Sequence, residues 1–236
     1  MRQDSAQATF IDVAVIGGGP AGLSGALYLA RFCRQVMVFD DGRSRASRIS
    51  RSHNVAGFEN GIEGHRLLHT MRLQCAAVGV RFVDGHVSSM IMEEGNFSLQ
   101  CDDDVVTARA VLIATGASDV EPSMEGLAEA VHEGAIRYCP VCDGYEIRGR
   151  MVGVLCDSTK GIGEALYLRH FTPKIHMFAT SRDIVFSDAE RRRIADAGIV
   201  LHESGVRALL LDARNTRFAF ERRDGVAVRH WPPPLR

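Results

Sequence analysis

The hydrophobic positions near the start of the chain change their spacing twice within a short stretch. Residues 10–16 form an apolar run of strand length, residues 23–30 carry apolar side chains at helical spacing, and residues 36–39 form a second apolar run that ends at Asp40. A strand, a helix and a strand within about thirty residues are typical of a βαβ unit. The pattern therefore predicts such a unit over residues 10–40.

The same succession recurs later in the chain, after a linker-like stretch at residues 119–122. The remaining pattern predicts helices at residues 62–78, 161–170 and 187–197, and strands at residues 80–83, 87–92, 97–101, 105–115, 151–155, 175–178, 199–202, 208–211 and 217–221. Strand–helix–strand thus occurs on each side of the linker. We predict an α/β fold with two Rossmann-like nucleotide-binding domains, residues 1–118 and residues 119–236.

Composition and charge exclude several classes of protein. The 236 residues are 46% hydrophobic and 24% charged, and 28 basic residues against 29 acidic ones leave a net charge of −1. This balance does not favour a nucleic-acid or lipid-surface partner. No apolar run approaches the roughly 18–20 residues that a membrane-spanning helix needs, and residues 1–9 lack the apolar stretch of a secretory signal. We therefore expect a cytoplasmic protein.

A glycine-rich turn lies between the first predicted strand and helix, with the sequence Gly17-Gly18-Gly19-Pro20-Ala21-Gly22. In a dinucleotide-binding turn Gly17 permits the sharp turn, Gly19 lets the backbone approach a pyrophosphate, and Gly22 allows close packing of helix on strand. The amides of the helix start would then face the phosphates, and Asp40 would accept hydrogen bonds from a ribose. The alternative is a glycine-rich turn without a ligand.

The loop that follows, residues 42–53, is basic and rich in serine. Asp41 could replace Asp40 in the ribose role, although a solvated turn residue is the simpler interpretation. The arginines at positions 43, 45, 48 and 51 could contact phosphates or could form a solvated face.

Six cysteines are spread along the chain, and only Cys139 and Cys142 are close together. The spacing Cys-x-x-Cys allows a small redox-active disulfide, and a helix beginning there would stabilise one thiolate. Half of a zinc site and an inert pair are the alternatives, but the sequence offers no second Cys or His pair to complete a zinc site. We therefore predict no metal. Asp143 could move a proton beside the second thiol, or could be a turn residue of Asp-Gly.

Together these motifs resemble the low-molecular-weight thioredoxin reductase family of flavoproteins, over about residues 10–180. The segments that carry the resemblance are Ile16–Gly22, Asn54–Gly57, Ala114–Ala117, Tyr138–Gly144 and Glu164–Leu168. The resemblance implies FAD on the first domain and an NADPH domain that carries the Cys-x-x-Cys pair. Electrons would pass from NADPH through the flavin to the disulfide, and on to a partner.

The family also implies roles for single residues. Cys139 would attack the partner disulfide, Cys142 would face the flavin, and Asp143 would be the acid–base residue. Further residues that would contact FAD are Asn54, Val87, Ala114, Thr115 and Gly116. The family's usual partner is thioredoxin and its usual assembly a homodimer, while a small-molecule disulfide is equally compatible with the Cys-x-x-Cys pair.

The sequence departs from the family's pattern in two regions, the nucleotide motifs of the second domain and the C-terminal end of the chain. The second glycine motif reads Cys156, Ser158 and Gly161 where Gly-x-Gly-x-x-Ala is expected, and residues 179–181 replace the basic stretch that holds the 2′-phosphate of NADPH. Side chains at the first two positions would crowd a pyrophosphate. In addition, no Gly-Asp segment closes the first domain after Gly116, and the chain ends in a proline-rich stretch, residues 231–236. We therefore expect the first domain to be incomplete at its C-terminal return.

Three functions remain open at this point. The first is a flavin-dependent thiol–disulfide oxidoreductase similar to thioredoxin reductase. The second is a flavin dithiol oxidase that needs no NADPH, which the changes at Cys156 and Ser158 favour. The third is a truncated, inactive flavoprotein.

Overall fold

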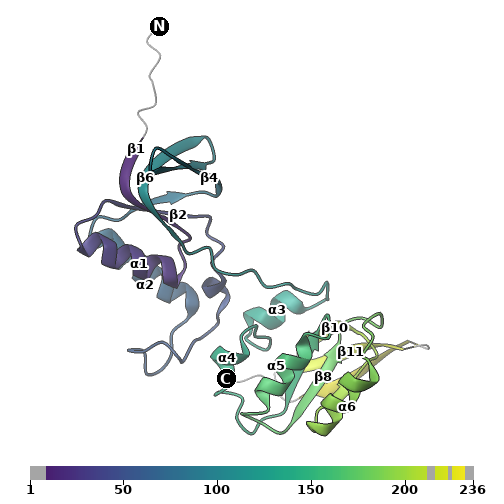
Figure 1. Cartoon of the computed structure of the whole chain (residues 1–236). Coiled ribbons are helices and arrows are strands. Elements are labelled where there is room, and N and C mark those ends of the chain that lie inside the picture. Colours follow the sequence, from purple (N-terminus) through teal and green to yellow (C-terminus); the bar gives the residue numbers. More distant parts are fainter. Residues whose placement is uncertain (1–8, 212–215, 223–224, 232–236) are drawn as a thin grey trace. The chain divides into compact units, whose positions relative to one another are not determined.

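The computed structural model describes residues 9–211, 216–222 and 225–231, with side chains described through residue 209. Its contacts divide the chain into two compact units (Figure 1). The first unit contains the described residues up to 49 and residues 60–118, and the second contains residues 50–59 and the described residues from 119 onward. The segment 50–59 therefore packs with the second unit, although its neighbours on both sides belong to the first.

The first unit is built on a six-stranded sheet. Its strands are β1 (Thr9–Ile16), β2 (Val36–Asp40), β3 (Arg81–Asp84), β4 (Val87–Glu93), β5 (Asn96–Cys101) and β6 (Asp104–Ile113). The spatial order is β3-β2-β1-β6-β5-β4, with the first four strands parallel and the last three joined as an antiparallel meander. Because β1 lies between β2 and β6, its C-terminal end meets the ends of both neighbours. That edge is where ligands bind in open α/β sheets.

Two helices, α1 (Pro20–Arg31) and α2 (Gly64–Ala77), pack beside each other on one face of this sheet (Figure 1). The side chains of β2 alternate between two cores, as strand geometry requires. Val38 packs in the helix-facing core with Leu23, and Phe39 packs on the opposite face with Leu99. A short 3-10 helix, η1 (Arg45–Arg48), lies in the predicted basic loop.

The second unit contains two three-stranded sheets. The strands β7 (Val152–Cys156), β8 (Ile175–Ala179) and β9 (Val200–His202) are parallel, whereas β10 (Val206–Leu211), β11 (Thr216–Arg222) and β12 (Gly225–Trp231) are antiparallel. Its helices are α3 (Leu127–His132), α4 (Pro140–Asp143), α5 (Gly161–Leu168) and α6 (Asp188–Asp196). A reciprocal pair of hydrogen bonds between Ser187 and Glu190 caps the start of α6.

Strand β8 joins the two cores of this unit. Met177 points into the core formed with α5 and α6, while Phe178 packs on the other face with Leu127 of α3 and Leu209 of β10. The parallel sheet is thus covered on both faces, as parallel sheets usually are.

The predicted α/β class is confirmed as a mixed α/β structure with parallel sheets, and each predicted helix and strand has a counterpart within a few residues. The sequence analysis missed η1, α3, α4 and β12, of which the three helices have at most six residues each and show little periodicity. The predicted strand 105–115 ends at Ile113, and residues 114–124 have no regular secondary structure. Of the predicted proline-rich end, residues 232–236 lie outside the described residues. No helix in the described part of the chain has the length and apolar character to cross a bilayer.

Candidate functional site: a disulfide helix and a glycine turn

Helix α4 begins directly after Cys139 and contains Cys142, and the two cysteines form a disulfide. Pro140 occupies the first helical position, where its missing N–H costs no hydrogen bond. The amide of Cys142 donates to Sγ of Cys139 at 3.1 Å and also lies 3.1 Å from the Cys139 carbonyl oxygen. When the disulfide opens, this amide is available to a thiolate on Cys139, and hydrogen bonds of this kind stabilise the charged form.

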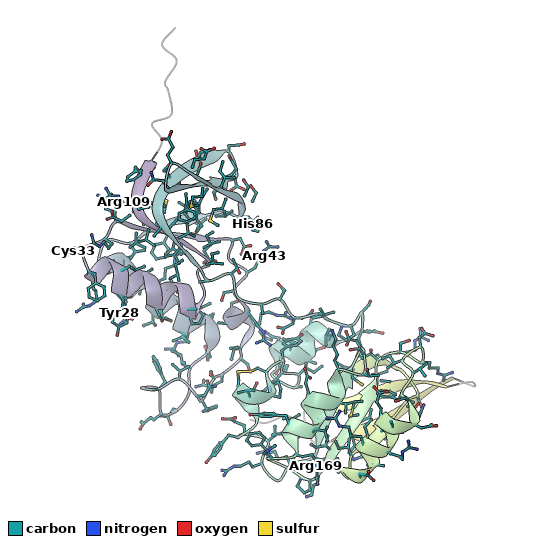
Figure 2. The ribbon with its side chains drawn as sticks, viewed as in Figure 1. Tyr28, Cys33, Arg43, His86, Arg109 and Arg169 are labelled. Atoms are coloured by element: carbon teal, nitrogen blue, oxygen red, sulfur yellow. A yellow bond between two sulfur atoms is a disulfide. The ribbon has the colours of Figure 1, made fainter. Side chains whose placement is uncertain are left out.

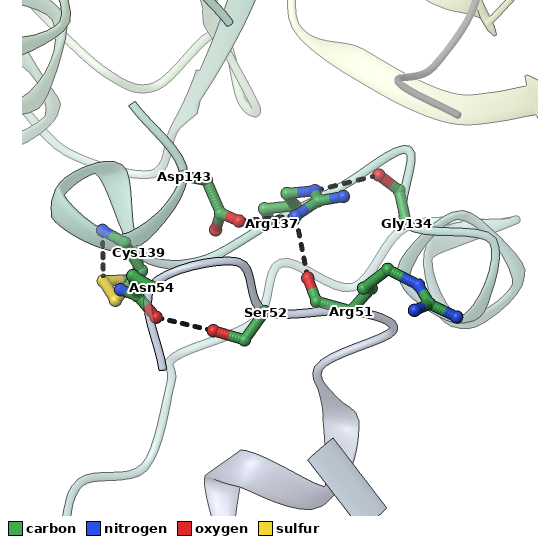
Figure 3. Close-up of polar contacts among 8 residues, drawn as sticks. Arg51, Ser52, Asn54, Gly134, Arg137, Cys139 and Asp143 are labelled. Atoms are coloured by element: carbon green, nitrogen blue, oxygen red, sulfur yellow. Dashed lines mark hydrogen bonds and ion pairs between the residues drawn. A yellow bond between two sulfur atoms is a disulfide. The ribbon is translucent and has the colours of Figure 1, made fainter. Parts of the chain in front are cut away.

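Asp143 follows the disulfide and pairs with Arg137. The guanidinium of Arg137 donates to Oδ1 of Asp143 at 2.5 Å, and the side chains are 21% and 19% exposed. Arg137 also donates to the carbonyl oxygens of Gly134, at 3.4 Å, and Arg51, at 3.5 Å (Figure 3). Three separate segments of the second unit therefore meet at one guanidinium.

A cavity of about 920 Å³ lies in the second unit beside this helix. Cys139 and Asp143 line one part of it, and the turn that follows β7, with Cys156 and Ser158, lines another. Its volume is in the range of small-molecule sites. Cys139 is thus the cysteine of the pair that faces space large enough for a small ligand.

Gly144 ends α4 against an aromatic ring. A Cβ at this position would overlap the ring of Phe171, whereas a Cβ on the exposed Gly163 of α5 would meet no atom within 4 Å. We expect Gly144→Ala to lower the free energy of unfolding by about 1–3 kcal/mol, because overpacking a filled site displaces its neighbours. Gly163→Ala is the matched control and should raise it by about 0.5–1 kcal/mol, since helical glycine costs entropy. Chemical denaturation followed by circular dichroism measures both; equal stability of the two variants would contradict the close packing.

The predicted glycine turn of the first unit lies at the C-terminal end of β1. Gly17 has a φ of +110°, and a Cβ there would overlap the carbonyl oxygen of Ala114. A Cβ on Gly22 would overlap the carbonyl oxygen of Gly17, so helix α1 sits directly on the turn. By contrast, a Cβ on Gly19 would meet only Oγ of Ser44, at 3.2 Å. The turn is tight where the protein packs and open where a pyrophosphate would approach.

The start of α1 is also free for a ligand. Gly19 is its N-cap and offers no side-chain cap, and Pro20 and Ala21 open the helix. Pro20 has no N–H, and the amides of Ala21 and Gly22 precede the first helical hydrogen bond, which Leu23 donates to the Gly19 carbonyl at 2.9 Å. Amides in this position are a ready site for phosphates.

Asp40 lies over this turn and Asp41 does not. A Cβ on Gly18 would overlap the Asp40 carboxylate. In that carboxylate, Oδ1 accepts a hydrogen bond from the amide of Gly42 at 3.2 Å, and Oδ2 accepts one from Nη1 of Arg72 at 3.4 Å. Asp41 instead pairs with Arg43 at 2.6 Å, and the hydrogen bonds from Arg43 lower the pKa of Asp41. Asp40 is therefore the one of the two carboxylates that lies against the turn, and the turn as a whole fits the adenosine diphosphate part of FAD.

The other residues expected at FAD divide between the two units. Ala114 meets the glycine turn, with Thr115 and Gly116 directly after it, and its amide donates to the carbonyl of Ile16 at 2.8 Å. Val87 begins β4 just after Gly85, whose amide binds the carbonyl of Asp40 at 3.0 Å. Asn54 is different, because it lies in the segment 50–59 that packs with the disulfide unit. There its Oδ1 accepts a hydrogen bond from Ser52 at 2.6 Å (Figure 3).

The corresponding turn of the second unit does not fit a dinucleotide in the same way. Cys156 fills the position of the first glycine, and a Cβ on Gly161 would come into contact with the Cβ of Cys156. In the usual motif the residue at the end of the strand is glycine and the residue at the helix start is alanine. Here the strand ends in Cys156 and the helix starts at Gly161, so α5 still packs closely on β7. Ser158 adds a second side chain, which donates to Asp157 at 3.1 Å. The turn thus places a carboxylate and two side chains where a pyrophosphate would need bare backbone.

The segment expected to hold a 2′-phosphate is also uncharged. Ala179 is buried at the end of β8, and Ser181 shares a hydrogen bond with Asp183 at 3.0 Å. Arg182 lies next in sequence and donates to the carbonyl of Ser204 at 3.3 Å. The residues present do not match the family's site for NADPH.

The remaining cysteines differ sharply in their surroundings, and all six cysteines lie in the described part of the chain. Cys33 is exposed at the end of α1 (Figure 2). The other three are buried, and burial raises the pKa of each, to about 11 for Cys156, where Asp157 and Glu164 add to the effect.

We therefore expect the folded, oxidised protein to expose one reactive thiol at neutral pH. A thiol with a raised pKa holds almost no thiolate, the reactive form, and burial blocks access as well. Titration with a chromogenic aromatic disulfide measures this number, and the same titration in denaturant should find four thiols. Rapid labelling of Cys156 in the folded chain would contradict this account.

No group of three or more His, Cys, Asp or Glu side chains gathers as a metal site within the described residues. The half-zinc interpretation of Cys139 and Cys142 thus has no second pair of ligands there.

Arg137 was not among the residues predicted from the sequence. It stands two residues before Cys139, in the run Ala135-Ile136-Arg137-Tyr138. The sequence signal that could have pointed to Arg137 is its charge, which lies in a mostly apolar stretch next to the Cys-x-x-Cys motif. Its contact with residue 51, however, spans 86 positions and cannot be read from spacing.

Comparisons with known proteins agree with this geometry. A family model described as pyridine nucleotide-disulphide oxidoreductase matches residues 11–216. Thioredoxin reductase of Borreliella burgdorferi is 24% identical over 175 residues, which cover 73% of this chain and 54% of that protein. The bifunctional thioredoxin reductase/thioredoxin of Mycobacterium leprae is 32% identical over 182 residues, 72% of this chain and 38% of that protein. The chain thus spans about half or less of the length of these two relatives.

Solved structures show the same similarity. The crystal structure of HlmI superimposes with a TM-score of 0.79 at 27% identity, covering 94% of this chain and 70% of that one. Thioredoxin reductase from Streptococcus pyogenes superimposes with a TM-score of 0.83 at 23% identity, covering 96% and 76% of the two chains. The second similarity shows the fold alone.

Proposed function

This chain belongs to the pyridine nucleotide-disulphide oxidoreductase family, and from this we propose that it is a flavin-dependent thiol–disulfide oxidoreductase. The observation that carries the proposal is the Cys139–Cys142 disulfide at the start of α4, in a chain whose first unit has an open glycine turn beneath Asp40. The thioredoxin reductases among its relatives support the same reaction class.

The first unit would hold FAD through the residues described above. The amides at the start of α1 would take the pyrophosphate, Asp40 would take the ribose, and residues 114–116 would line the cofactor beside the turn. Bound FAD would supply two-electron exchange with the disulfide. In this proposal the FAD domain corresponds to residues 1–118, and the domain that carries the disulfide corresponds to residues 119–236.

The disulfide centre itself would work by thiol–disulfide exchange. With both cysteines reduced, the Cys139 thiolate attacks a partner disulfide, forms a mixed disulfide and releases one partner thiolate. Cys142 then attacks Cys139, re-forms the protein disulfide and releases the second partner thiolate. The partner gains two electrons and two protons, and Asp143 moves protons to and from the sulfurs. The amide of Cys142, 3.1 Å from Sγ of Cys139, supports Cys139 as the attacking thiolate.

Two classes of partner are compatible with this centre. Relatives named thioredoxin reductase favour a thioredoxin-like protein. The cavity that Cys139 lines favours a small-molecule disulfide or dithiol. A second copy of this chain could assemble with it, as the resemblance to the family implies.

A second candidate function is a flavin dithiol oxidase that uses no NADPH. It is favoured by the turn after β7, where Cys156 and Ser158 replace the bare backbone that a pyrophosphate needs. Electrons would then enter from a dithiol and leave from the flavin to oxygen.

Anaerobic reduction of the FAD-loaded chain distinguishes these functions. The purified chain is incubated with FAD, freed of excess cofactor, and mixed with dithiothreitol in one sample and with NADPH in another. We expect the dithiol to bleach the flavin band in either case, through the Cys139–Cys142 disulfide. Bleaching by NADPH as well supports the first function, and no response to NADPH supports the second. A chain that retains no FAD would refute both functions.

A further inference from the structure

The Arg137 guanidinium is the point where the acid–base residue, the loop after α3 and the segment 50–59 are joined. It donates to Oδ1 of Asp143 at 2.5 Å and to the carbonyl oxygens of Gly134 and Arg51. All of these groups lie in the second unit. A planar guanidinium spreads five donors over three nitrogens and can serve three separated acceptors at once, whereas a lysine has its three donors on a single nitrogen.

The ion pair sits at the wall of the cavity that the disulfide faces. Arg137, Cys139 and Asp143 all line it. Both partners of the pair are about four-fifths buried, so water screens their attraction less than it would at the surface. A carboxylate held by such a contact has little freedom to turn away from the cavity that Cys139 also lines.

We propose that Arg137 is a positioning residue of the disulfide centre. It holds the Asp143 carboxylate at the cavity wall beside Cys139, and it fastens residues 50–59 to the helix that carries the disulfide. This inference rests on the proposed redox role of Cys139 and Cys142, and it adds a residue through which Asp143 acts. Arg137 touches neither sulfur nor partner in this role.

The role can be tested on the disulfide alone, without flavin. One thiol of dithiothreitol attacks the protein disulfide, forms a mixed disulfide and releases a cysteine thiolate. The second thiol then closes the cyclic dithiothreitol disulfide and releases the other cysteine. The protons of the two attacking thiols end on Cys139 and Cys142, and Asp143 carries them. The rate is measured at pH 7 by acid quenching and thiol labelling of the full chain.

Four variants and one control are compared. Arg137→Gln is expected to slow disulfide opening about tenfold or more, because a small misplacement of a catalytic group costs up to about a hundredfold. Asp143→Asn should slow it similarly, and the double variant should be no slower than the slower single variant, since the two residues act as a unit. Arg137→Lys should recover part of the rate. The control is Arg191→Gln, which breaks the Arg191–Glu203 ion pair of the same unit far from the disulfide in sequence.

A purely structural role of Arg137 predicts the opposite change in the rate of disulfide opening. If Arg137 only held α4 in place, its loss would loosen the helix and speed the opening of the disulfide. A rate equal to or above that of the wild type, or a double variant whose two effects multiply, would overturn the proposal. Should Arg137→Gln fail to fold, Arg137→Lys decides: a rate below that of Arg191→Gln supports the proposal, and an equal rate overturns it. Failure of flavin binding would leave this test unaffected, so the two proposals can fail separately.

Discussion

Replacing Cys139 or Cys142 with serine is expected to lower flavin-dependent disulfide turnover by at least about a thousandfold, as loss of a catalytic nucleophile usually does. Neither variant can form the protein disulfide that we propose exchanges electrons with the flavin. The two variants should differ in one respect. Cys142→Ser keeps the cysteine that faces the cavity, and it should accumulate a mixed disulfide with the partner, because no second thiol resolves it.

The matched control for these variants is Cys33→Ser, which removes the exposed thiol at the end of α1. It should turn over like the wild type. The flavin is first reduced with dithionite under anaerobic conditions, and activity is followed as the initial rate at which the added disulfide reoxidises it. The mixed disulfide is detected by mass spectrometry. If both serine variants kept most of their turnover, the disulfide would have no part in the reaction. Trapping by Cys139→Ser instead of Cys142→Ser would reverse the assigned order of the two cysteines.

Gly19→Val is expected to abolish most FAD binding while leaving the fold intact. The φ of −77° and ψ of 179° at Gly19 suit any residue, and a Cβ there meets only Ser44. The chain without FAD therefore tolerates a side chain at this position. In the complex, that side chain occupies the space through which the backbone approaches the pyrophosphate. We expect the dissociation constant for FAD to rise about a hundredfold, or about 2.7 kcal/mol.

Gly163→Ala serves as the control for this variant, because it also adds a side chain to a glycine but lies in the second unit, where the new Cβ meets no atom within 4 Å. Fluorescence quenching of added FAD gives the affinity, and thermal unfolding confirms that both variants fold. An unchanged affinity in Gly19→Val would remove the turn from the proposed cofactor site, whatever its sequence pattern.

The sequence allowed prediction of the parts of the fold that depend on local pattern. The order β1-α1-β2 follows from apolar spacing and from glycines at positions where the structure leaves no room for a Cβ, as at Gly22. Helix α4 escaped prediction because four residues are too few for periodicity, and its stability comes from the disulfide, from Pro140 and from packing of Gly144 on Phe171.

Long-range packing decided what the sequence could not show. Asn54 was expected among the residues of the first domain, yet its segment packs with the disulfide unit. Arg137 reaches Arg51 from 86 positions away, a pairing that no short motif encodes. The sequence showed that Cys156 interrupts the second glycine motif. It did not show that Gly161 leaves room for the Cys156 side chain, so that strand β7 and helix α5 still pack closely.

We expect the flavin and the Cys139–Cys142 disulfide to exchange electrons, and an anaerobic dithionite titration of the FAD-loaded chain tests this claim most directly. Dithionite reduces flavin readily, and the disulfide would receive its electrons through the flavin. We predict that the wild-type chain takes up about four electrons before the flavin band is fully bleached, two for each centre, and that the double variant Cys139→Ser, Cys142→Ser takes up about two. An uptake of about two electrons by both proteins would show that the disulfide is isolated from the flavin and would contradict the claim.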